Sequence, residues 1–195
     1  MSDARSRILL AMARLIEKQG YHATGLNEII RESDTPKGSL YYYFPGGKEQ
    51  IGAEAIVEAG KIISGRLRSA LAGEEQPAEA VYTFLTRMAE NVEASQFGAG
   101  SPLTTATVET AVTSEAINQA CREAFDMILV AFKDKFLAGG LTEIQAAELA
   151  LYVTTVVEGG ILMSRTYHHA EPLRLAAKHL KRYLENLSRL FPRWV

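Results

Sequence analysis

The residues best suited to chemistry in this chain lie between Thr35 and Ile51. This segment, TPKGSLYYYFPGGKEQI, puts Lys37 and Ser39 ahead of three consecutive tyrosines. A lysine ammonium donates to guanine O6 and N7, and serine and tyrosine hydroxyls donate to phosphate oxygens. These residue types, gathered on one short helix, predict contact with DNA.

The boundaries of that helix follow from its prolines. Thr35 is predicted to cap it and Pro36 to open it, because a proline at the first helical position lacks only an N–H that would have been unpaired there. Pro45 ends it after about two turns, since the residue before a proline is biased out of the helical region. Phe44 and Tyr43 have an alternative role, because a domain this small needs aromatic area for its core.

Two helices are predicted upstream of this one. Apolar residues recur at helical spacing over 7–20, where Gly20 supplies the stop, and again over 25–33, where Thr24 is the predicted N-cap. The tripeptide Ser33-Asp34-Thr35 then joins two short helices. Such a pair predicts a helix-turn-helix, whose second helix enters the major groove of DNA.

With YHATGLNEIIRESDTPKGSLYYYFPGGKEQI after an amphipathic helix, roughly the first 55 residues resemble the N-terminal domain of TetR-family transcriptional regulators. The resemblance implies an all-helical homodimer with a DNA-binding head and a ligand-binding body. The chain departs from the family pattern at Asp34 in the turn and at a second glycine, Gly47. The resemblance implies contacts with base edges or phosphates, and the donor chemistry agrees with most of them. These predicted DNA-binding residues are Thr24, Lys37, Gly38, Ser39, Leu40, Tyr41, Tyr42, Tyr43 and Lys48.

The charge of the chain does not by itself indicate a nucleic-acid partner. The sequence holds 21 Lys and Arg against 23 Asp and Glu. Residues 1–50 carry seven basic and six acidic side chains, which leaves 14 and 17 for the rest, so the net charges are +1 and −3. A dimer doubles every phosphate contact, and we therefore expect binding with a modest salt dependence.

The rest of the chain is predicted to be helical, because no alternating strand pattern of convincing length occurs. Turn residues divide it into six further helices. The expected ranges are 48–71, 77–95, 104–112, 114–137, 142–167 and 172–190. The fold class is therefore all-α with about nine helices, divided into a head over 1–47 and a ligand-binding and dimerisation body over 48–195.

Cellular location and redox chemistry are bounded by simple counts. No apolar run approaches the roughly 20 uncharged residues of a membrane span, and the N-terminus has no secretory segment, so we expect a cytoplasmic protein without a membrane partner. The single cysteine, Cys121, excludes an internal disulfide. It lies on an apolar helix stripe, where a buried small side chain is favoured over the alternative of a redox sensor.

The last two predicted helices favour a homodimer interface. Gly159 and Gly160 would each destabilise a helix by about 1 kcal/mol, a cost that close approach of another helix would offset. The last helix carries a broad apolar face, which favours a four-helix bundle built from two protomers. The alternative is packing of these two helices within one protomer.

A second resemblance concerns the ligand. The segments FGAGSPLTTATVETAVTSEAINQACREAF and VVEGGILMSRTYHHAEPL resemble the C-terminal domain of the LmrA and YxaF subgroup of TetR-type regulators, some of which respond to flavonoids or drug-like aromatics. The subgroup's Gly-Cys-Pro is Gly100-Ser101-Pro102 here. Soft, aromatic and branched side chains at helical spacing predict the walls of a pocket, although such stripes also make plain cores. These residues are Met88, Val92, Phe97, Leu103, Phe125, Leu129, Tyr152, Val156 and Met163.

Glu158 is added to the candidate ligand-binding residues because an acid inside an apolar stretch must be paired, protonated or used. Arg165, two turns further on, could pair with it, which would make Glu158 an interface or core residue instead.

Catalysis is not expected. The chain has no nucleotide-binding glycine fingerprint and no nucleophile elbow, and His168 and His169 are adjacent, so they do not share a helix face for a metal. The predicted function is a ligand-responsive regulator, a repressor released from a palindromic operator by a small hydrophobic or aromatic effector, without cofactor or metal. The alternative is a small-molecule-binding helical protein without sequence-specific DNA binding.

Overall fold

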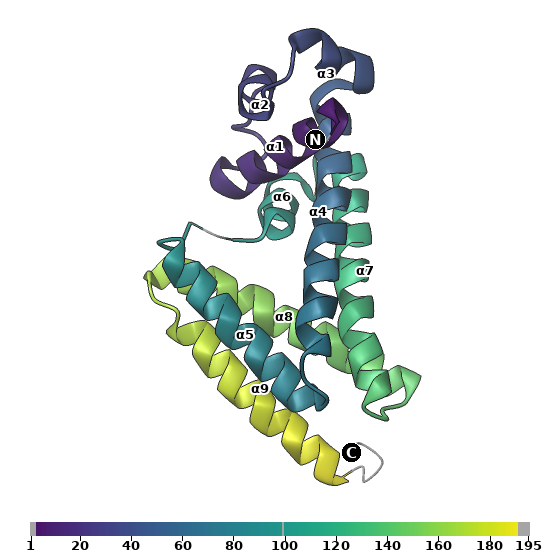
Figure 1. Ribbon diagram of the computed structural model, residues 1–195, viewed down its shortest axis with the longest axis vertical. Coiled ribbons are helices and arrows are strands. Elements are labelled where there is room, and N and C mark those ends of the chain that lie inside the picture. Colours follow the sequence, from purple (N-terminus) through teal and green to yellow (C-terminus); the bar gives the residue numbers. More distant parts are fainter. Residues whose placement is uncertain (1–2, 99, 191–195) are drawn as a thin grey trace. The chain divides into compact units, whose positions relative to one another are not determined.

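The computed structural model describes residues 3–98 and 100–190, which form nine α-helices and no strand (Figure 1). The predicted all-α class is confirmed. The helices are α1 (Ala4–Gln19), α2 (Leu26–Ser33), α3 (Lys37–Tyr43), α4 (Gly47–Ala72), α5 (Pro77–Ala94), α6 (Pro102–Thr110), α7 (Glu115–Ala138), α8 (Glu143–Tyr167) and α9 (Glu171–Leu190).

Several helix ends follow the predicted signals. Gly20 ends α1 with a φ of 92°, a conformation that suits glycine, and its N–H donates to the Ile16 carbonyl. Pro77 opens α5. Thr142 caps α8 in a capping box, in which its hydroxyl accepts from the Gln145 N–H and the Gln145 side chain accepts from the Thr142 N–H.

The predicted caps of the two helix-turn-helix members are wrong. The residue at the N-cap of α2 is Gly25, and the residue at the N-cap of α3 is Pro36, neither with a side-chain cap. The Thr24 hydroxyl instead donates to the Gly20 carbonyl at 2.7 Å, and the Thr35 hydroxyl lies 2.7 Å from the Ser33 hydroxyl. Both threonines stabilise the connections around the helices rather than the first helical turns.

Two compact units divide the chain. Unit 1 consists of Met1–Ile62 and Ser101–Asp126, and unit 2 consists of Ile63–Gly100 and Met127–Val195. Both α4 and α7 contribute residues to each unit. The predicted division after residue 47 concerned the end of the DNA-binding part, and it stays a prediction.

Unit 1 is built around α1, which contacts α2, α3 and α6. One face of α1 is buried, and Ile29, Leu40 and Phe44 complete the core of the head. Close approach of α4 and α7 requires Gly60, because a Cβ there would lie 2.6 Å from that of Ala124. The helix-turn-helix is thus mounted on a packed helical support.

In unit 2, α9 packs against α5 and α8. Gly160 is buried, and a Cβ there would lie 2.9 Å from Leu173 Cδ2 of α9. The close approach at Gly160 is therefore within one protomer, and the predicted intermolecular reason is wrong for this glycine. Gly159 is exposed and a Cβ there would have no neighbour within 4 Å.

Helix α8 has a notable composition. Among the described residues it is the one helix that is long and apolar enough to cross a membrane, with a mean hydropathy of 1.4 over its most apolar stretch. Length and composition alone are weak evidence, because a core helix of a soluble protein passes the same test. One side of α8 is buried against its own unit, through Val153, Val157 and Ile161 among others.

Candidate nucleic-acid interface

The turn between α2 and α3 is held by hydrogen bonds to the last turn of α2. Asp34 adopts a left-handed conformation with a φ of 48°, which Asp tolerates better than most side chains. Its N–H donates to the Arg31 carbonyl at 3.4 Å, and the Thr35 N–H donates to the Ile30 carbonyl at 3.4 Å. The Asp34 departure from the family pattern therefore serves the turn geometry.

Helix α3 divides into a buried and an exposed side. Leu40 and the following Phe44 are fully buried, which confirms the predicted core role of Phe44. Tyr42 is 79% exposed, Tyr41 49% and Tyr43 37%. The core residues fix the helix, and three aromatic side chains remain outside it.

Two predicted contact residues need correction. The side chains of Thr24 and Leu40 are fully buried, and the Thr24 hydroxyl is used by the Gly20 carbonyl. Neither side chain has a surface from which to reach DNA. Their types suggested contact, but both are required by the packing of the head.

The N-terminal end of α3 is open. Lys37 and Gly38 are exposed, and the Lys37 ammonium lies 6.0 Å from the centre of the Tyr41 ring. A Cβ at Gly38 would have nothing within 4 Å. Packing of the protein itself therefore does not require glycine here, and a large neighbour has room to approach the backbone.

Lys48, at the start of α4, is tied to the head. Its Nζ donates to the His22 carbonyl at 3.1 Å and lies 4.5 Å from the centre of the Tyr21 ring. Partial burial lowers the pKa of Lys48, and the charge of Glu109 opposes that shift. The ammonium keeps further N–H donors, so a phosphate contact stays a prediction.

Glu109 of α6, which no sequence pattern indicates, contacts the connection between α1 and α2. The Glu109 Oε2 atom accepts a hydrogen bond from the His22 backbone N–H at 2.8 Å, and the His22 ring Nε2 lies 3.3 Å from the Glu109 carbonyl oxygen. A second link joins the Ser114 hydroxyl to Glu49 at 2.7 Å. No spacing in the sequence signals contacts between residues so far apart.

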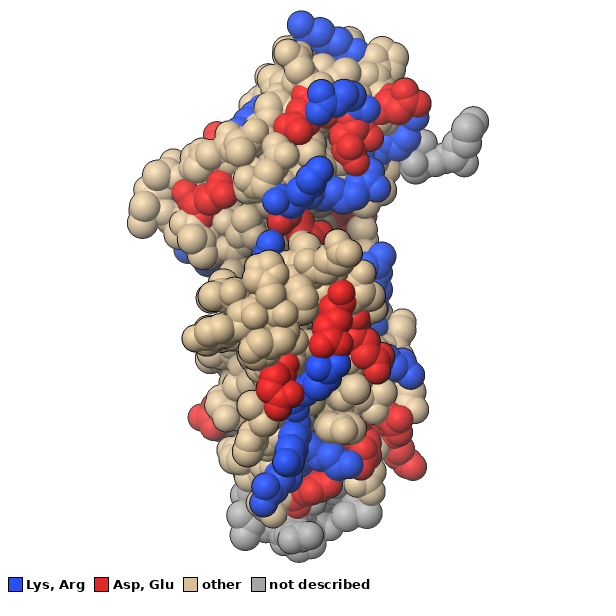
Figure 2. All heavy atoms as spheres, turned by 90° about the vertical axis from the view of Figure 1, so that its left-hand side faces the viewer, with Lys and Arg blue, Asp and Glu red and all other residues tan. Residues whose placement is uncertain are grey.

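Charge is mixed on the surface. Figure 2 shows Lys and Arg interleaved with Asp and Glu over one face of the molecule. Several of the basic groups in the head are paired with acids, such as Arg5 with Glu54 and Arg14 with Glu32. Specific donors on α3, rather than a broad basic field, are therefore the basis for a DNA contact.

The ten candidate ligand-binding residues are distributed over both units. Leu103 and Phe125 belong to unit 1, and the other eight belong to unit 2. Leu103 and Val92 are buried, and Tyr152 and Met163 are exposed. The remaining six are partly buried, namely Met88, Phe97, Phe125, Leu129, Val156 and Glu158.

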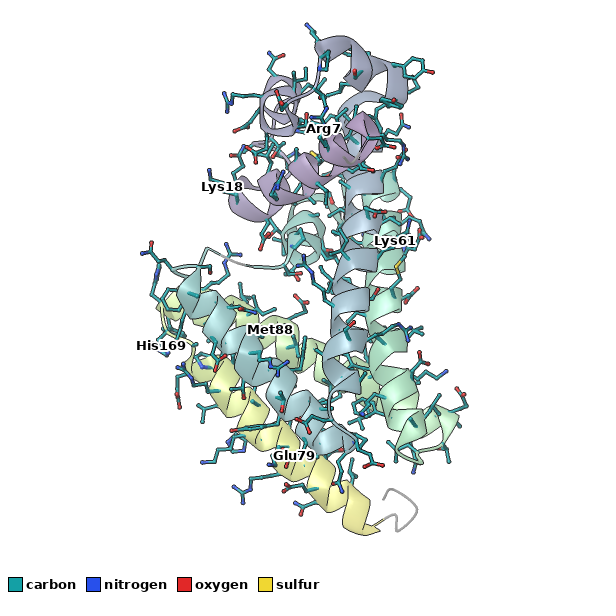
Figure 3. The ribbon with its side chains drawn as sticks, in the orientation of Figure 1. Arg7, Lys18, Lys61, Glu79, Met88 and His169 are labelled. Atoms are coloured by element: carbon teal, nitrogen blue, oxygen red, sulfur yellow. The ribbon has the colours of Figure 1, made fainter. Side chains whose placement is uncertain are left out.

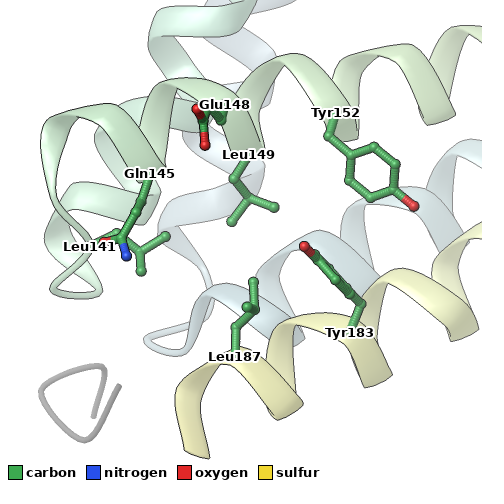
Figure 4. Close-up of a pocket in the computed structure, with 7 residues that line it drawn as sticks. All are labelled: Leu141, Gln145, Glu148, Leu149, Tyr152, Tyr183 and Leu187. Carbon is green, nitrogen blue, oxygen red and sulfur yellow. The ribbon is translucent and has the colours of Figure 1, made fainter. Parts of the chain in front are cut away.

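Two grooves within unit 2 contain members of this set. Met88 lines one between α4 and α5 (Figure 3). Tyr152 lines another between α8 and α9, of about 380 Å³, where its ring meets Tyr183 edge-on at 5.7 Å (Figure 4). Each groove is of a size that admits a small molecule or a side chain of another protein.

Three polar side chains of α8 bear on the predicted Glu158–Arg165 pair and on what else this helix could bind. Arg165 Nε donates to the Phe97 carbonyl at 3.3 Å, and the pairing with Glu158 stays a prediction. The hydroxyls of Thr154 and Ser164 are buried and have no hydrogen-bond partner among the described residues. Nothing in the sequence indicates these unpaired hydroxyls, because serine and threonine within a helix usually bond to the preceding turn.

Cys121 and His168 have structural roles in the protein. Burial raises the pKa of the Cys121 thiol, and its sulfur lies 3.8 Å from the Leu103 carbonyl, as expected for a buried small side chain. His168 caps α8 with a φ of 51°. Within residues 3–98 and 100–190, no three His, Cys, Asp or Glu side chains come together as a metal site.

Comparison with known proteins gives two family matches. Residues 8–55 match the model of bacterial regulatory proteins of the tetR family, and residues 77–179 match the C-terminal domain of LmrA/YxaF-like transcriptional regulators. The first match contains the helix-turn-helix, and the second covers α5, α6, α7, α8 and the first half of α9.

Individual relatives agree over most of their length. The chain is 39% identical over 171 residues to the HTH-type transcriptional regulator LmrA of Bacillus subtilis, which covers 88% of this chain and 91% of that one. It is 36% identical over 178 residues to YxaF of the same organism, with 91% and 93% covered.

Solved structures share the fold. Regulatory protein TetR from Rhodobacter sphaeroides superposes with a TM-score of 0.80 at 20% identity, over 93% of this chain and 98% of that one. The reduced form of NemR from E. coli superposes with a TM-score of 0.78 at 21% identity, over 92% and 96%.

Proposed function

Because the chain belongs to the TetR family of DNA-binding transcriptional regulators, we propose that it is a repressor which a small effector releases from a palindromic operator. One observation carries the proposal. Leu40 of α3 and Phe44 at its C-cap are buried, whereas Lys37, Tyr41 and Tyr42 of the same helix are exposed. A helix fixed by its core side, with donors on its outer side, is suited to the major groove.

We propose that Lys37 reads base edges, and that Tyr42, Tyr43 and Lys48 contact phosphates. Gly38 and Ser39 would let the start of α3 approach the DNA backbone, and Tyr41 would flank it. Contacts with bases provide sequence preference, whereas contacts with phosphates orient the protein on any sequence.

A homodimer would present two heads to two half-sites. The side of α8 that is not buried carries Leu151 and Leu162, which are 58% and 57% exposed, beside the open Gly159. Exposed apolar side chains at this density support an interface with a second copy. Two-fold symmetry then predicts half-sites about 34–36 Å apart, or a multiple of that spacing.

Release by an effector would be a shift of population between conformers. A ligand that binds better to the conformer with badly spaced heads lowers operator affinity in proportion to that preference. Helix α4 would transmit the change, because its residues belong to both units. We propose that the effector is a small hydrophobic or aromatic compound.

The proposed role in DNA binding also suggests where the protein acts and what it does not do. We propose that it acts in the cytoplasm, where chromosomal DNA is accessible, and that it has no enzymatic activity of its own. The relatives named above are transcriptional regulators.

Comparison of a complete operator with an isolated half-site tests the proposed binding mode. Fluorescence anisotropy at several salt concentrations should give one dimer per complete operator and much weaker binding to the half-site. Equal affinities for the two duplexes would contradict a symmetric dimer.

A further inference from the structure

A groove of unit 2 lies between the second half of α4 and α5, with a volume of about 280 Å³. Its apolar part includes Leu67, Phe84 and Met88, and its polar part includes Arg66, Arg87 and Asn91. Ligand sites in proteins typically measure about 300–1,000 Å³, so this groove suits a compound of small size.

The apolar part is preformed. Leu67 is buried, and Phe84 is held edge-on against the Phe132 ring at 6.0 Å, which in turn stacks on Phe136 at 6.2 Å. Met88 is partly buried and supplies a flexible, polarizable surface. A hydrocarbon or aromatic group can therefore bind here without rearrangement of the wall.

The charged side chains that line the groove are both positive. Arg66 and Arg87 are exposed, and neither has an ion pair or hydrogen bond with any other described residue. By contrast Arg68, two residues further along α4, pairs with Asp134 at 2.5 Å. The residues that line the groove include no Asp or Glu.

We propose that this groove binds small amphipathic anions, with the apolar group on Phe84 and Met88 and a carboxylate or phosphate on Arg66 and Arg87. A guanidinium offers several N–H donors in one plane, and its bonds to carboxylate or phosphate are stronger than neutral ones. A neutral hydrophobic compound would leave both charges unused. The inference names an effector class for the ligand response proposed above and rests on that proposal for its regulatory consequence.

Nuclear magnetic resonance of the full chain tests the site directly. The protein has five methionines, so methyl-labelled methionine gives few signals, and Met88→Leu assigns the signal of interest. Decanoate, decyl phosphate, decanol and decyltrimethylammonium have alkyl chains of nearly the same length and differ mainly in the head group; decanol is used below its solubility limit and the other three below their micelle concentrations. We expect both anions to shift the Met88 methyl signal saturably and to bind about tenfold more tightly than decanol, with the cation weakest.

Arginine variants separate charge from hydrophobicity. Arg66→Gln and Arg87→Gln should each weaken decanoate binding about three- to tenfold and leave decanol unchanged. Arg182→Gln is the matched control, because Arg182 of α9 is also exposed, has no ion pair with the described residues and does not line the groove. Decanol that binds as tightly as decanoate, or wild-type decanoate affinity in the double arginine variant, would overturn the proposal.

A second measurement separates this inference from the proposed function. Saturating decanoate should weaken operator binding by the native protein and not by the double arginine variant. Unchanged operator affinity with the groove filled would overturn the effector role of these anions. Absence of any operator binding would instead contradict the proposed regulator, while the methyl titration, which contains no DNA, still tests the groove.

Discussion

The carboxylate of Glu109 in α6 accepts the backbone N–H of His22 at 2.8 Å. His22 lies in the connection between α1 and α2, and its carbonyl accepts the Lys48 ammonium. A side chain within the region of the LmrA/YxaF-type match thus contacts the connection that leads into the helix-turn-helix. Gly20 leaves room for it, because a Cβ at that position would overlap the Glu109 carboxylate.

Loss of the Glu109 acceptor should weaken both the head and its DNA contact. We expect Glu109→Ala to lower the free energy of unfolding by about 0.5–1.5 kcal/mol, the usual value of one hydrogen bond, and to lower operator affinity. Glu109→Gln keeps an acceptor oxygen and should stay close to native. Chemical denaturation and anisotropy measure the two effects, and Glu115→Ala, which removes a surface acid paired with Arg122, is the control. Native operator affinity in Glu109→Ala would show that the contact does not position the head.

Gly38→Ala should separate DNA binding from folding. The new methyl group has nothing within 4 Å in the protein, and alanine favours a helix over glycine by up to about 1 kcal/mol, so thermal stability should stay level or rise. Operator affinity should fall, because the methyl group occupies space needed by the DNA. Gly65→Ala on α4 is the matched control, since it is equally open in the protein. If both variants bind the operator like the native protein, DNA does not approach α3 at Gly38.

Lys37 and Tyr42 should differ in what they contribute. Lys37→Ala is expected to cost about 1–3 kcal/mol on the preferred operator and to relax the base preference at one position of each half-site. Tyr42→Phe removes only a hydroxyl and should weaken all duplexes alike, by about 1 kcal/mol. Competition binding with a panel of single-base operator variants distinguishes the two patterns. A uniform loss for Lys37→Ala would identify it as a phosphate contact.

The dimer depends on the exposed side of α8. Leu162→Glu should convert the protein to monomers, because a carboxylate would have to be desolvated at the interface. Sedimentation velocity and circular dichroism measure assembly and folding, and Ile144→Glu, another exposed apolar residue of α8, tests how far the interface extends. A variant that stays dimeric and folded at native concentrations would place the interface elsewhere.

Local signals in the sequence were sufficient to predict where most of the helices begin and end. Pro77, Gly20 and the Thr142 capping box act within one turn of the chain, so their effects could be read directly. Thr24 and Leu40 could not be assigned from residue type, because exposure depends on how α1 packs on α2 and α3.

Contacts between residues far apart in the chain could not be predicted from such local signals. Gly160 has a helical neighbour, as expected, but that neighbour is Leu173 of the same chain. The contact between Glu109 and His22 joins residues that are 87 positions apart. Neither partner could be identified from periodicity or spacing, because both depend on the tertiary arrangement of helices within a unit.

Selection of random duplex DNA on the purified protein, at near-physiological salt, tests the central claim most directly. We predict enrichment of a two-fold symmetric sequence with half-sites set by the spacing of two α3 helices, and in Lys37→Ala loss of the base preference at one position of each half-site. Failure of any sequence to enrich, with the protein folded and dimeric, would contradict sequence-specific regulation and favour a helical protein that only binds small molecules.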